Sequence, residues 1–400
     1  MKKLLGYARK DPVLVTALVL AVISMAVIHP DQKYIQYIDF RTLGILFGLM
    51  AIVGGMQQLG VFDRLAERVI RKTSGRMSMV VVLVMLCFVS SMLITNDVAL
   101  ITFVPFAMIL LRKETGLFDE TWILRVVVMQ TIAANLGSML TPVGNPQNLY
   151  LFGLTRMGMD DFIRLMLPYS LVAFVLLIGW IGVSCQWQRI TDDRQPLFDK
   201  KAEKKIYPAA AAIEVPQRER TTYVLTSQQG NSGDMWKLWG YMVLFGMSLL
   251  VVGRMIPWYL LTILVFGYVL FFDRKTLQKV DYSLLITFLA LFLFIGNLGR
   301  MEIFRHILEQ MLHGRERITA VAASQIMSNV PAAILLSDFT DNISELIVGT
   351  NLGGLGTLIA SMASLISFKY IAKEYPAQRG RYLAMFTVAN VIFLFVLIIM

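Results

Sequence analysis

The sequence has 400 residues, of which 56% are hydrophobic and only 16% are charged. Soluble domains carry about a quarter charged residues, so this composition excludes an ordinary soluble protein. The net charge of +10 does not indicate a nucleic-acid partner, because the basic residues stand in short loops between apolar runs. Both cysteines, Cys87 and Cys185, lie inside apolar runs without metal-ligand or disulfide spacing, and we interpret them as packing residues.

Apolar runs of membrane-spanning length recur along the chain and predict an all-α polytopic membrane protein. These runs are 13–28, 42–59, 165–183, 241–252 with 258–272, and 383–400. No small-residue cleavage site follows the first run, so we interpret it as a retained span and not as a signal peptide.

The distribution of positive charge predicts the orientation of the spans. With the N-terminus in the cytoplasm and the C-terminus in the periplasm of a bacterial inner membrane, 28 of the 37 Lys and Arg residues fall in cytoplasmic segments. This count requires residues 78–111 to enter and leave the membrane on the same side, and we interpret them as a re-entrant hairpin. Two full spans would fit the charges equally well, but the polar centre of this segment favours the hairpin.

One long polar segment divides the chain into two halves. Residues 188–235 are rich in Lys, Gln, Pro and Thr and predict a flexible cytoplasmic linker. The other predicted parts are an N-terminal transmembrane helix at 1–37, a first repeat at 38–187, joining transmembrane helices at 236–279, and a second repeat at 280–400.

The two halves resemble each other at three places, in the same order. The matched stretches are IDFRTLGILFGLMAIVGGMQQLGVFDRLAERV with VDYSLLITFLALFLFIGNLGRMEIFRHILEQM, ITNDVA with MSNVPA, and ANLGSMLTPVG with TNLGGLGTLIA. On the predicted topology Asp39 lies at the outer end of its helix and its counterpart Asp281 at the inner end, so the halves are inverted. Inverted repeats with matching broken helices are typical of secondary transporters. A duplication without a transport role is the alternative, although stability alone would remove polar breaks.

The second matched pair predicts the tips of two hairpins. In ITNDVA, Asn96 or Asp97 can cap a half-helix that begins at Val98. In MSNVPA, Asn329 can cap a half-helix whose first turn contains Pro331. Each tip would direct free helical N–H groups toward the membrane centre, where they suit an anion, and unwound carbonyls nearby suit a sodium ion.

The third matched pair predicts two transmembrane helices that are unwound in the middle. In NLGSMLTPVGNPQNLYLF, Pro142 and Gly144 stop a helix, and Asn145 and Pro146 restart one as N-cap and first-turn residues. The counterpart, NLGGLGTLIASMASLISF, uses glycines and serines instead. A single Asn would fit a helix-packing hydrogen bond, but four matched breaks favour two related binding sites.

Asp97 is the only carboxylate that the predicted topology places near the membrane centre, and its counterpart is Val330. An ionisable residue at this depth predicts a function, either as a carrier of the coupling proton or as a ligand of a cation. A helix cap that faces a wet cavity is the alternative. Neither tip contains Lys or Arg, so an anion would be held by dipoles, amides and hydroxyls, or by a bound cation.

These motifs resemble the ion transporter superfamily of arsenite permeases, NhaD-type sodium/proton antiporters and divalent anion/sodium symporters. TNDVALITFVPFAM and MSNVPAAILL are similar to the hairpin-tip motifs of the arsenite-permease-like branch. NLGSMLTPVGNPQNLYL and NLGGLGTLIASMASL are similar to the unwound-helix motifs. The resemblance covers about residues 38–400 without the linker, and it implies a homodimer whose transport part moves as an elevator against a scaffold.

The resemblance, together with the matched asparagines, indicates a substrate and ion site. The predicted site residues are Thr95, Asn96, Asp97, Asn135, Thr141, Pro142, Gly144, Asn145, Ser328, Asn329, Asn351 and Thr357. A coupling Na⁺ would lie at Asn96, Asp97 and Gly144. The symporters have Ser-Asn-Thr tips where this chain has Thr-Asn-Asp and Ser-Asn-Val, which argues against dicarboxylate and two-sodium coupling. The second loop lacks the Thr-Pro pair, so we expect two non-equivalent sites.

Other classes of protein fit the sequence less well. The stretches GVSC and GMSL resemble a serine-protease motif, but His29, His306 and His313 lie in or near loops, away from a serine that needs a base. The sequence has neither a GxxxxGK[ST] phosphate loop nor an HExxH zinc motif. Broken helices also build channels, but the inverted repeat favours a transporter.

The sequence therefore predicts a secondary active transporter and not an enzyme. We expect it to move a small anion or oxyacid across the inner membrane, coupled to H⁺ or Na⁺ and without a further cofactor. A sodium/proton antiporter is the second interpretation.

Overall fold

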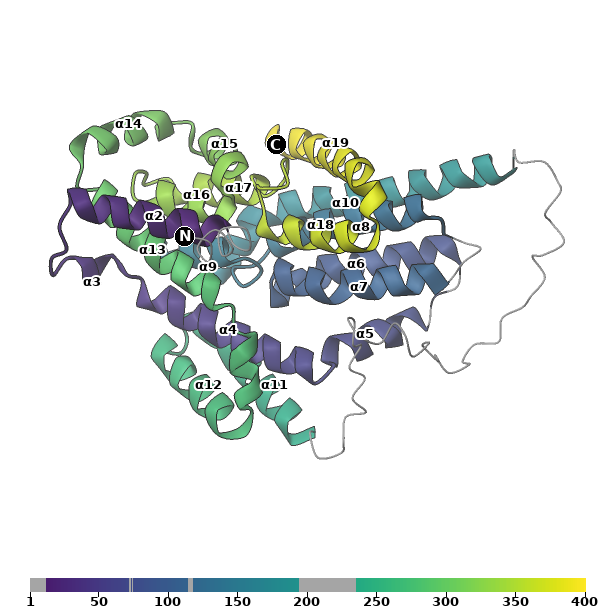
Figure 1. The fold of residues 1–400 in the computed structure, drawn as a ribbon, viewed down its shortest axis with the longest axis horizontal. Coiled ribbons are helices and arrows are strands. Elements are labelled where there is room, and N and C mark those ends of the chain that lie inside the picture. The colour runs from purple at the N-terminus through teal and green to yellow at the C-terminus, as the bar shows by residue number, and fades with distance from the viewer. Residues whose placement is uncertain (1–11, 72, 74, 114–117, 194–234) are drawn as a thin grey trace.

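The computed structural model describes residues 12–71, 73, 75–113, 118–193 and 235–400, and no strand occurs among them. Figure 1 shows the arrangement of the helices. Before residue 194 they are α2 (Pro12–Val27), α3 (Tyr34–Tyr37), α4 (Phe40–Gln58), α5 (Val61–Ile70), α6 (Arg76–Ile94), α7 (Asn96–Lys113), α8 (Glu120–Ser138), α9 (Pro146–Leu154) and α10 (Met159–Asp193). After residue 234 they are α11 (Met235–Val252), α12 (Trp258–Phe272), η2 (Arg274–Lys279), α13 (Tyr282–Leu298), α14 (Glu302–Leu312), α15 (Glu316–Met327), α16 (Asn329–Ser337), α17 (Ile343–Leu352), α18 (Met362–Glu374), η3 (Pro376–Gln378) and α19 (Arg379–Ile398).

Several described helices are long and apolar enough to cross a membrane. They are α4, α6, α11, the Met159–Gln186 part of α10, and Pro376–Ile398, which ends in α19. Helices α13 and α14 pass the same test together, but the chain bends by 103° between them. These helices agree with the prediction of an all-α polytopic membrane protein.

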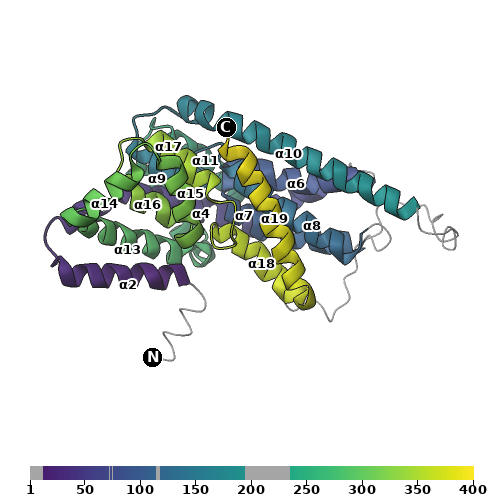
Figure 2. The same cartoon turned by 90° about the horizontal axis from the view of Figure 1, so that it is seen from above.

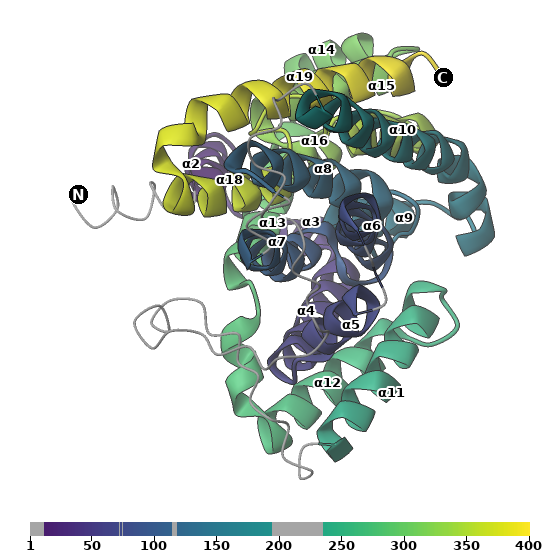
Figure 3. The ribbon, with the colours of Figure 1, turned by 90° about the vertical axis from the view of Figure 1, so that its right-hand side faces the viewer.

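Each half of the chain packs a pair of helices against a helix that is interrupted by an unwound stretch. We call these stretches the breaks: residues 139–145 between α8 and α9, and residues 353–361 between α17 and α18. In the first half, α6 and α7 lie side by side and α8 packs against both (Figures 1 and 3). In the second half, α15 packs against α16 and α17. The helix that follows each break then leaves its own half: α9 packs against α16 and α17, and α18 packs against α7 and α8. The two halves are therefore interlocked at their breaks.

Helices α11 and α12 form a separate layer. Both pack against α4, and Figure 3 shows α4 between them and the rest of the helices. Helix α2 packs along α13, and Figure 2 shows α2 and α10 on opposite sides of the molecule.

Both helices before the breaks come close to a neighbour at a glycine. A Cβ atom on Gly137 of α8 would lie 2.0 Å from the carbonyl oxygen of Phe88 in α6. A Cβ atom on Gly353, directly after α17, would lie 2.5 Å from the hydroxyl of Ser324 in α15. Small residues of this kind let membrane helices approach closely, so each glycine allows tight packing next to a break.

The helix starts at the tips differ from the prediction. Helix α7 begins at Asn96 and not at Val98, and α16 begins at Asn329, so Ser328 takes the N-cap position expected for Asn329. The reason is that the backbone turns sharply at Thr95 and Ser328, which lets the helix start at the next residue. At the first break, Asn145 is the N-cap residue of α9 with Pro146 in its first turn, as predicted, although its side chain makes no capping hydrogen bond.

Parts of the predicted organisation lie outside the described residues. Helix α10 continues to Asp193, past the predicted start of the linker at 188, and the remaining linker residues 194–234 are not described. The basic N-terminal segment 1–11 is likewise outside the described ranges.

Replacing Gly137 by alanine is expected to destabilise the protein, because its Cβ would overlap the α6 backbone. Overpacking of this kind costs about 1–3 kcal/mol. The melting temperature of the purified protein in detergent measures the effect. Gly179→Ala in α10 is the matched control, since no atom lies within 4 Å of its added Cβ. Equal melting temperatures for the two variants would contradict the close contact.

Candidate functional site

The two tips share an uncommon backbone conformation. Thr95 has φ 70° and ψ 148°, and Ser328 has φ 76° and ψ 154°. Among the described non-glycine residues, positive φ occurs elsewhere only at Arg254. Such a conformation costs about 1–3 kcal/mol and persists where the surrounding structure holds it in place. The same strain at matched positions therefore indicates that the surrounding structure keeps both tips in a fixed conformation.

Each tip is tied to the break of its own half by a backbone hydrogen bond. The N–H of Asn96 donates to the carbonyl of Gly144 in the first break, residues 139–145 (3.1 Å). The N–H of Asn329 donates to the carbonyl of Ala360 in the second break, residues 353–361 (3.0 Å). These carbonyls are free for the tips because both helices are unwound there. The predicted residues Asn96, Gly144 and Asn329 thus lie where tip and break meet.

A hydroxyl in each break makes a second matched contact. Thr141 donates a hydrogen bond to the carbonyl of Met92, in the last turn of α6. Thr357 donates to the carbonyl of Gln325, in the last turn of α15 (3.3 Å). Gln325 also accepts, through its side-chain oxygen, from the N–H of Thr357 (2.8 Å). The environments of the two hydroxyls differ, since Thr141 is half-buried and Thr357 is exposed.

The two halves are joined by reciprocal side-chain pairs. Asn135, at the end of α8, donates to the hydroxyl of Ser364 in α18 (3.2 Å). Asn351, at the end of α17, donates to the side-chain oxygen of Asn148 in α9 (2.6 Å). All four residues are buried. We call these four residues, together with Ser361, the crossing.

Asn135 connects the crossing to the first tip. Its side-chain oxygen accepts from the amide of Asn96 (3.1 Å) and from the hydroxyl of Ser361 in the second break (3.0 Å). One buried asparagine therefore links the first tip, the first broken helix and the second break. A buried polar network of this kind is stable only when each group has its partner.

Two buried amide oxygens at the site have no hydrogen-bond donor. They are the side-chain oxygens of Asn145 and Asn351. The other end of the Asn145 amide donates to the hydroxyl of Ser138 (2.7 Å). Buried acceptors are normally satisfied, and neutral oxygens of this type are ligands for hard cations.

Asp97 lies in the first turn of α7 and is half-buried. Its N–H donates to the side-chain oxygen of Asn96 (2.9 Å). Asp281, the N-cap residue of α13, is close enough to repel its carboxylate. The charge of a second acidic residue therefore acts on Asp97, which the sequence analysis did not anticipate.

The remaining predicted residues surround this arrangement. Pro142 is buried in the first break, and Ser328 donates through its hydroxyl to the carbonyl of Ala360 (3.4 Å). Sequence reasoning missed Asn148, Ser361 and Ser364. The spacing that pairs Asn135 with Asn351 also pairs Asn148 with Ser364, and this signal could have found them. Among the described residues, no group of three or more His, Cys, Asp and Glu side chains could hold a metal ion.

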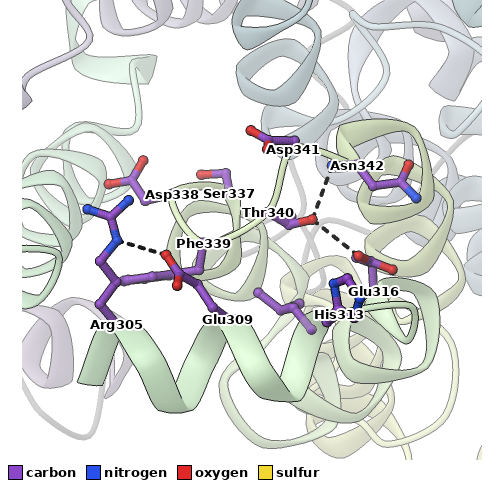
Figure 4. Close-up of a pocket in the computed structure, with 11 residues that line it drawn as sticks. Arg305, Glu309, His313, Glu316, Ser337, Asp338, Phe339, Thr340, Asp341 and Asn342 are labelled. Carbon is purple, nitrogen blue, oxygen red and sulfur yellow. Dashed lines mark hydrogen bonds and ion pairs between the residues drawn. The ribbon is translucent and has the colours of Figure 1, made fainter. Parts of the chain in front are cut away.

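A separate pocket of about 480 Å³ opens between α14 and the loop after α16 (Figure 4). Its acidic residues are Glu309, Glu316, Asp338 and Asp341, and Arg305 pairs with Glu309 (2.7 Å). None of the predicted site residues lines this pocket. It adjoins α9, because the hydroxyl of Ser337 on its wall bonds that of Tyr150 (2.9 Å).

Comparison with known proteins identifies relatives over most of the chain. The model of a family described as citrate transporter matches residues 8–345. An uncharacterised transporter of Methanocaldococcus jannaschii is 28% identical over 93% of this chain and 92% of its own. The inner membrane protein YbiR of Escherichia coli is 27% identical over 87% and 84%, and the silicon efflux transporter LSI3 of Oryza sativa is 23% identical over 87% and 76%.

The fold and these relatives define a membrane transporter and not an enzyme. The chain belongs to the citrate transporter family, within the ion transporter superfamily that its motifs resemble.

The reciprocal pairs predict an energetic coupling that a double-mutant cycle can measure. Asn351→Ala and Asn148→Ala should each lower the free energy of unfolding, because each leaves a buried partner unsatisfied, at about 1–3 kcal/mol. The double variant should be less destabilised than the sum by at least ~0.5 kcal/mol. Asn351→Ala with Gly179→Ala is the additive control. Additive effects for both pairs would contradict the contact.

Proposed function

We propose that this protein is a secondary active transporter that moves a small anion or oxyacid across the inner membrane of a bacterial cell, coupled to Na⁺ or H⁺. The observation that carries the proposal is the crossing, where two broken helices exchange buried hydrogen bonds and each break bonds its own tip. Secondary transporters bind substrate and coupling ion where such discontinuous helices meet.

The matched contacts support an arrangement as two inverted repeats. The tip-to-break bonds, the strained tip residues and the glycine contacts recur at equivalent positions of both halves. The N-caps recur as well: Asp39 accepts from the N–H of Thr42, and Asp281 from that of Leu284, both at 3.0 Å.

The separate layer of α11 and α12, which packs on α4, supports the division into a scaffold and a moving part. We propose that this layer is the scaffold, that the tips and breaks move against it as an elevator, and that the scaffold pairs two protomers in a homodimer.

Contacts at the two ends of the molecule support the proposed orientation, with a cytoplasmic N-terminus and a periplasmic C-terminus. Arg112 pairs with Glu374 (3.0 Å), and the count of positive charge assigns both to the cytoplasm. Arg300 pairs with Asp31 (2.9 Å), and the same count assigns both to the periplasm. Both partners of each salt bridge are thus assigned to the same side of the membrane, as a direct contact requires.

The chemistry of the site supports a weakly charged substrate or one that binds with a cation. The hydrogen bonds at the crossing involve amides, hydroxyls and backbone groups and no Lys or Arg. A citrate-like anion there would need a co-bound cation to balance its charge. An undissociated oxyacid would need only hydrogen bonds, and silicon, which the name of the rice relative gives as its cargo, forms such an acid.

We place the coupling ion at the first tip, at Asn96, Asp97 and Gly144. The carboxylate of Asp97 and the carbonyl oxygens of the break suit Na⁺ or a proton. The proximity of Asp281 favours a second candidate function, a sodium/proton antiporter, because two nearby carboxylates attract cations.

Flux into proteoliposomes tests the transporter proposal. Citrate, silicic acid or arsenite should accumulate when a pH or sodium gradient is imposed. An antiporter would instead dissipate a pH gradient with Na⁺ or Li⁺ alone and no anion. If none of these solutes moves under either gradient, the proposal is wrong.

The variant Asp97→Asn tests the coupling site. Removing a charged contact worth ~1.5–3 kcal/mol should lower the apparent affinity for the coupling cation by about 10–100-fold. Flux measured against sodium concentration and external pH reads this out. Asp63→Asn in α5, outside the crossing, is the matched control and should retain wild-type coupling. Unchanged coupling in Asp97→Asn would remove Asp97 from the mechanism.

A further inference from the structure

Two arginines meet away from the crossing, where α9 ends. Arg41 lies in the first turn of α4, and Arg254 lies in the turn between α11 and α12. Both guanidinium groups reach the same short segment, Phe152–Thr155, and they are close enough to repel each other. This places two positive charges at one end of α9, while the crossing lies at the other.

Arg254 is fixed in this position by several contacts. Its guanidinium donates to the carbonyl of Phe152 (2.7 Å) and to that of Thr155, and it stands 4.9 Å from the centre of the Phe152 ring. Its backbone has φ 63°, an uncommon conformation for a residue with a side chain. The side chain therefore occupies two of the carbonyls at the end of α9, those of Phe152 and Thr155.

Arg41 packs against α9, but one of its guanidinium nitrogens lacks a hydrogen-bond acceptor there. A Cβ atom on Gly153 would lie 2.7 Å from its Nη1, so a glycine makes room for the guanidinium. Its Nη2 is buried and has no hydrogen-bond partner. Asp39 is the nearby carboxylate, but its two oxygens accept from the N–H (3.0 Å) and the hydroxyl (2.5 Å) of Thr42.

The cluster therefore has two positive charges, one negative charge and an unused buried donor. Burying a charged donor without a partner is unfavourable, so this arrangement calls for an acceptor with negative charge. The planar fork of a guanidinium matches the oxygens of a phosphate group, and Arg is the common residue at phosphate sites. We propose that Arg41 and Arg254 bind a phosphate group, either that of a lipid headgroup or a free phosphate.

The location fits a ligand at the membrane surface. Helix α4 is a candidate membrane span and begins at Phe40, beside Arg41, so the cluster lies at headgroup level. Phe40 is 50% exposed and offers an apolar contact next to the charges. The length of α9 separates the cluster from the first break by about 13 Å, so this ligand differs from the transported substrate. It would hold α9 against α4 and the α11–α12 turn in the conformation seen here.

Thermal stability of the purified full-length protein tests the site. Sodium phosphate, compared with sodium chloride at equal ionic strength, probes a free phosphate. Phosphatidylglycerol, compared with phosphatidylcholine in mixed micelles, probes a headgroup. We expect at least one of the two probes to raise the melting temperature of the wild type by roughly 2–4 °C, and the probe that does so identifies the source. Arg41→Gln and Arg254→Gln should lose this shift.

Matched variants separate binding from a purely structural role. Arg300→Gln removes an arginine that already pairs with Asp31, and it should keep the wild-type shift. Arg41→Lys keeps the charge but not the fork, and it should show a smaller shift even where Arg41→Gln does not fold. The proposal is overturned if neither probe stabilises the wild type, or if the shift survives in both the Arg41 and the Arg254 variants.

Discussion

The hydrogen bonds between the two broken helices are the constraint on which the rest of the structure depends. An unwound helix inside a membrane leaves backbone groups that lipid cannot satisfy. Here the carbonyls of Gly144 and Ala360 in the two breaks accept hydrogen bonds from the tips of their own halves. The side chains of Asn135 and Asn351 bond side chains of the opposite half. Because α9 and α18 pack on the opposite half, each break is followed by a helix that is covered by the other half. The polar site and the packing of the two halves on each other thus both follow from the need to give polar groups in the breaks hydrogen-bond partners.

The strain at the tips belongs to the same arrangement. Thr95 and Ser328 adopt a backbone conformation that side-chain-bearing residues avoid, and this allows the next N–H to reach the carbonyl of the break. If Asn96 or Asn329 were a conventional N-cap, the helix would start after it, and its side chain would accept from an N–H in the first turn of that helix. In the observed conformation the side-chain nitrogen of Asn96 donates to Asn135 in α8, while its side-chain oxygen accepts from the N–H of Asp97.

Local sequence signals predicted much of the fold and only part of the site. Apolar runs located the membrane helices, and Pro146 with Asn145 located the restart after the first break, because both act through short-range chemistry. The start of α7 was misplaced because positive φ at a threonine has no sequence signature. Partners that lie far apart in the chain, such as Asn135 with Ser364, depend on how the halves pack, and a single segment does not encode this. The internal repeat was the one long-range signal, and its spacing pairs Asn148 with Ser364.

Interlocking of the halves also governs how the chain can be made. Asn148 of α9 finds its partner Asn351 only 203 residues later in the chain. During synthesis α9 therefore enters the membrane long before α16 and α17 exist to cover it. The side-chain oxygen of Asn148 has no donor from Asn351 until translation of the second half is nearly finished. A chain that ended before α16 and α17 would leave the surface of α9 that packs on them uncovered.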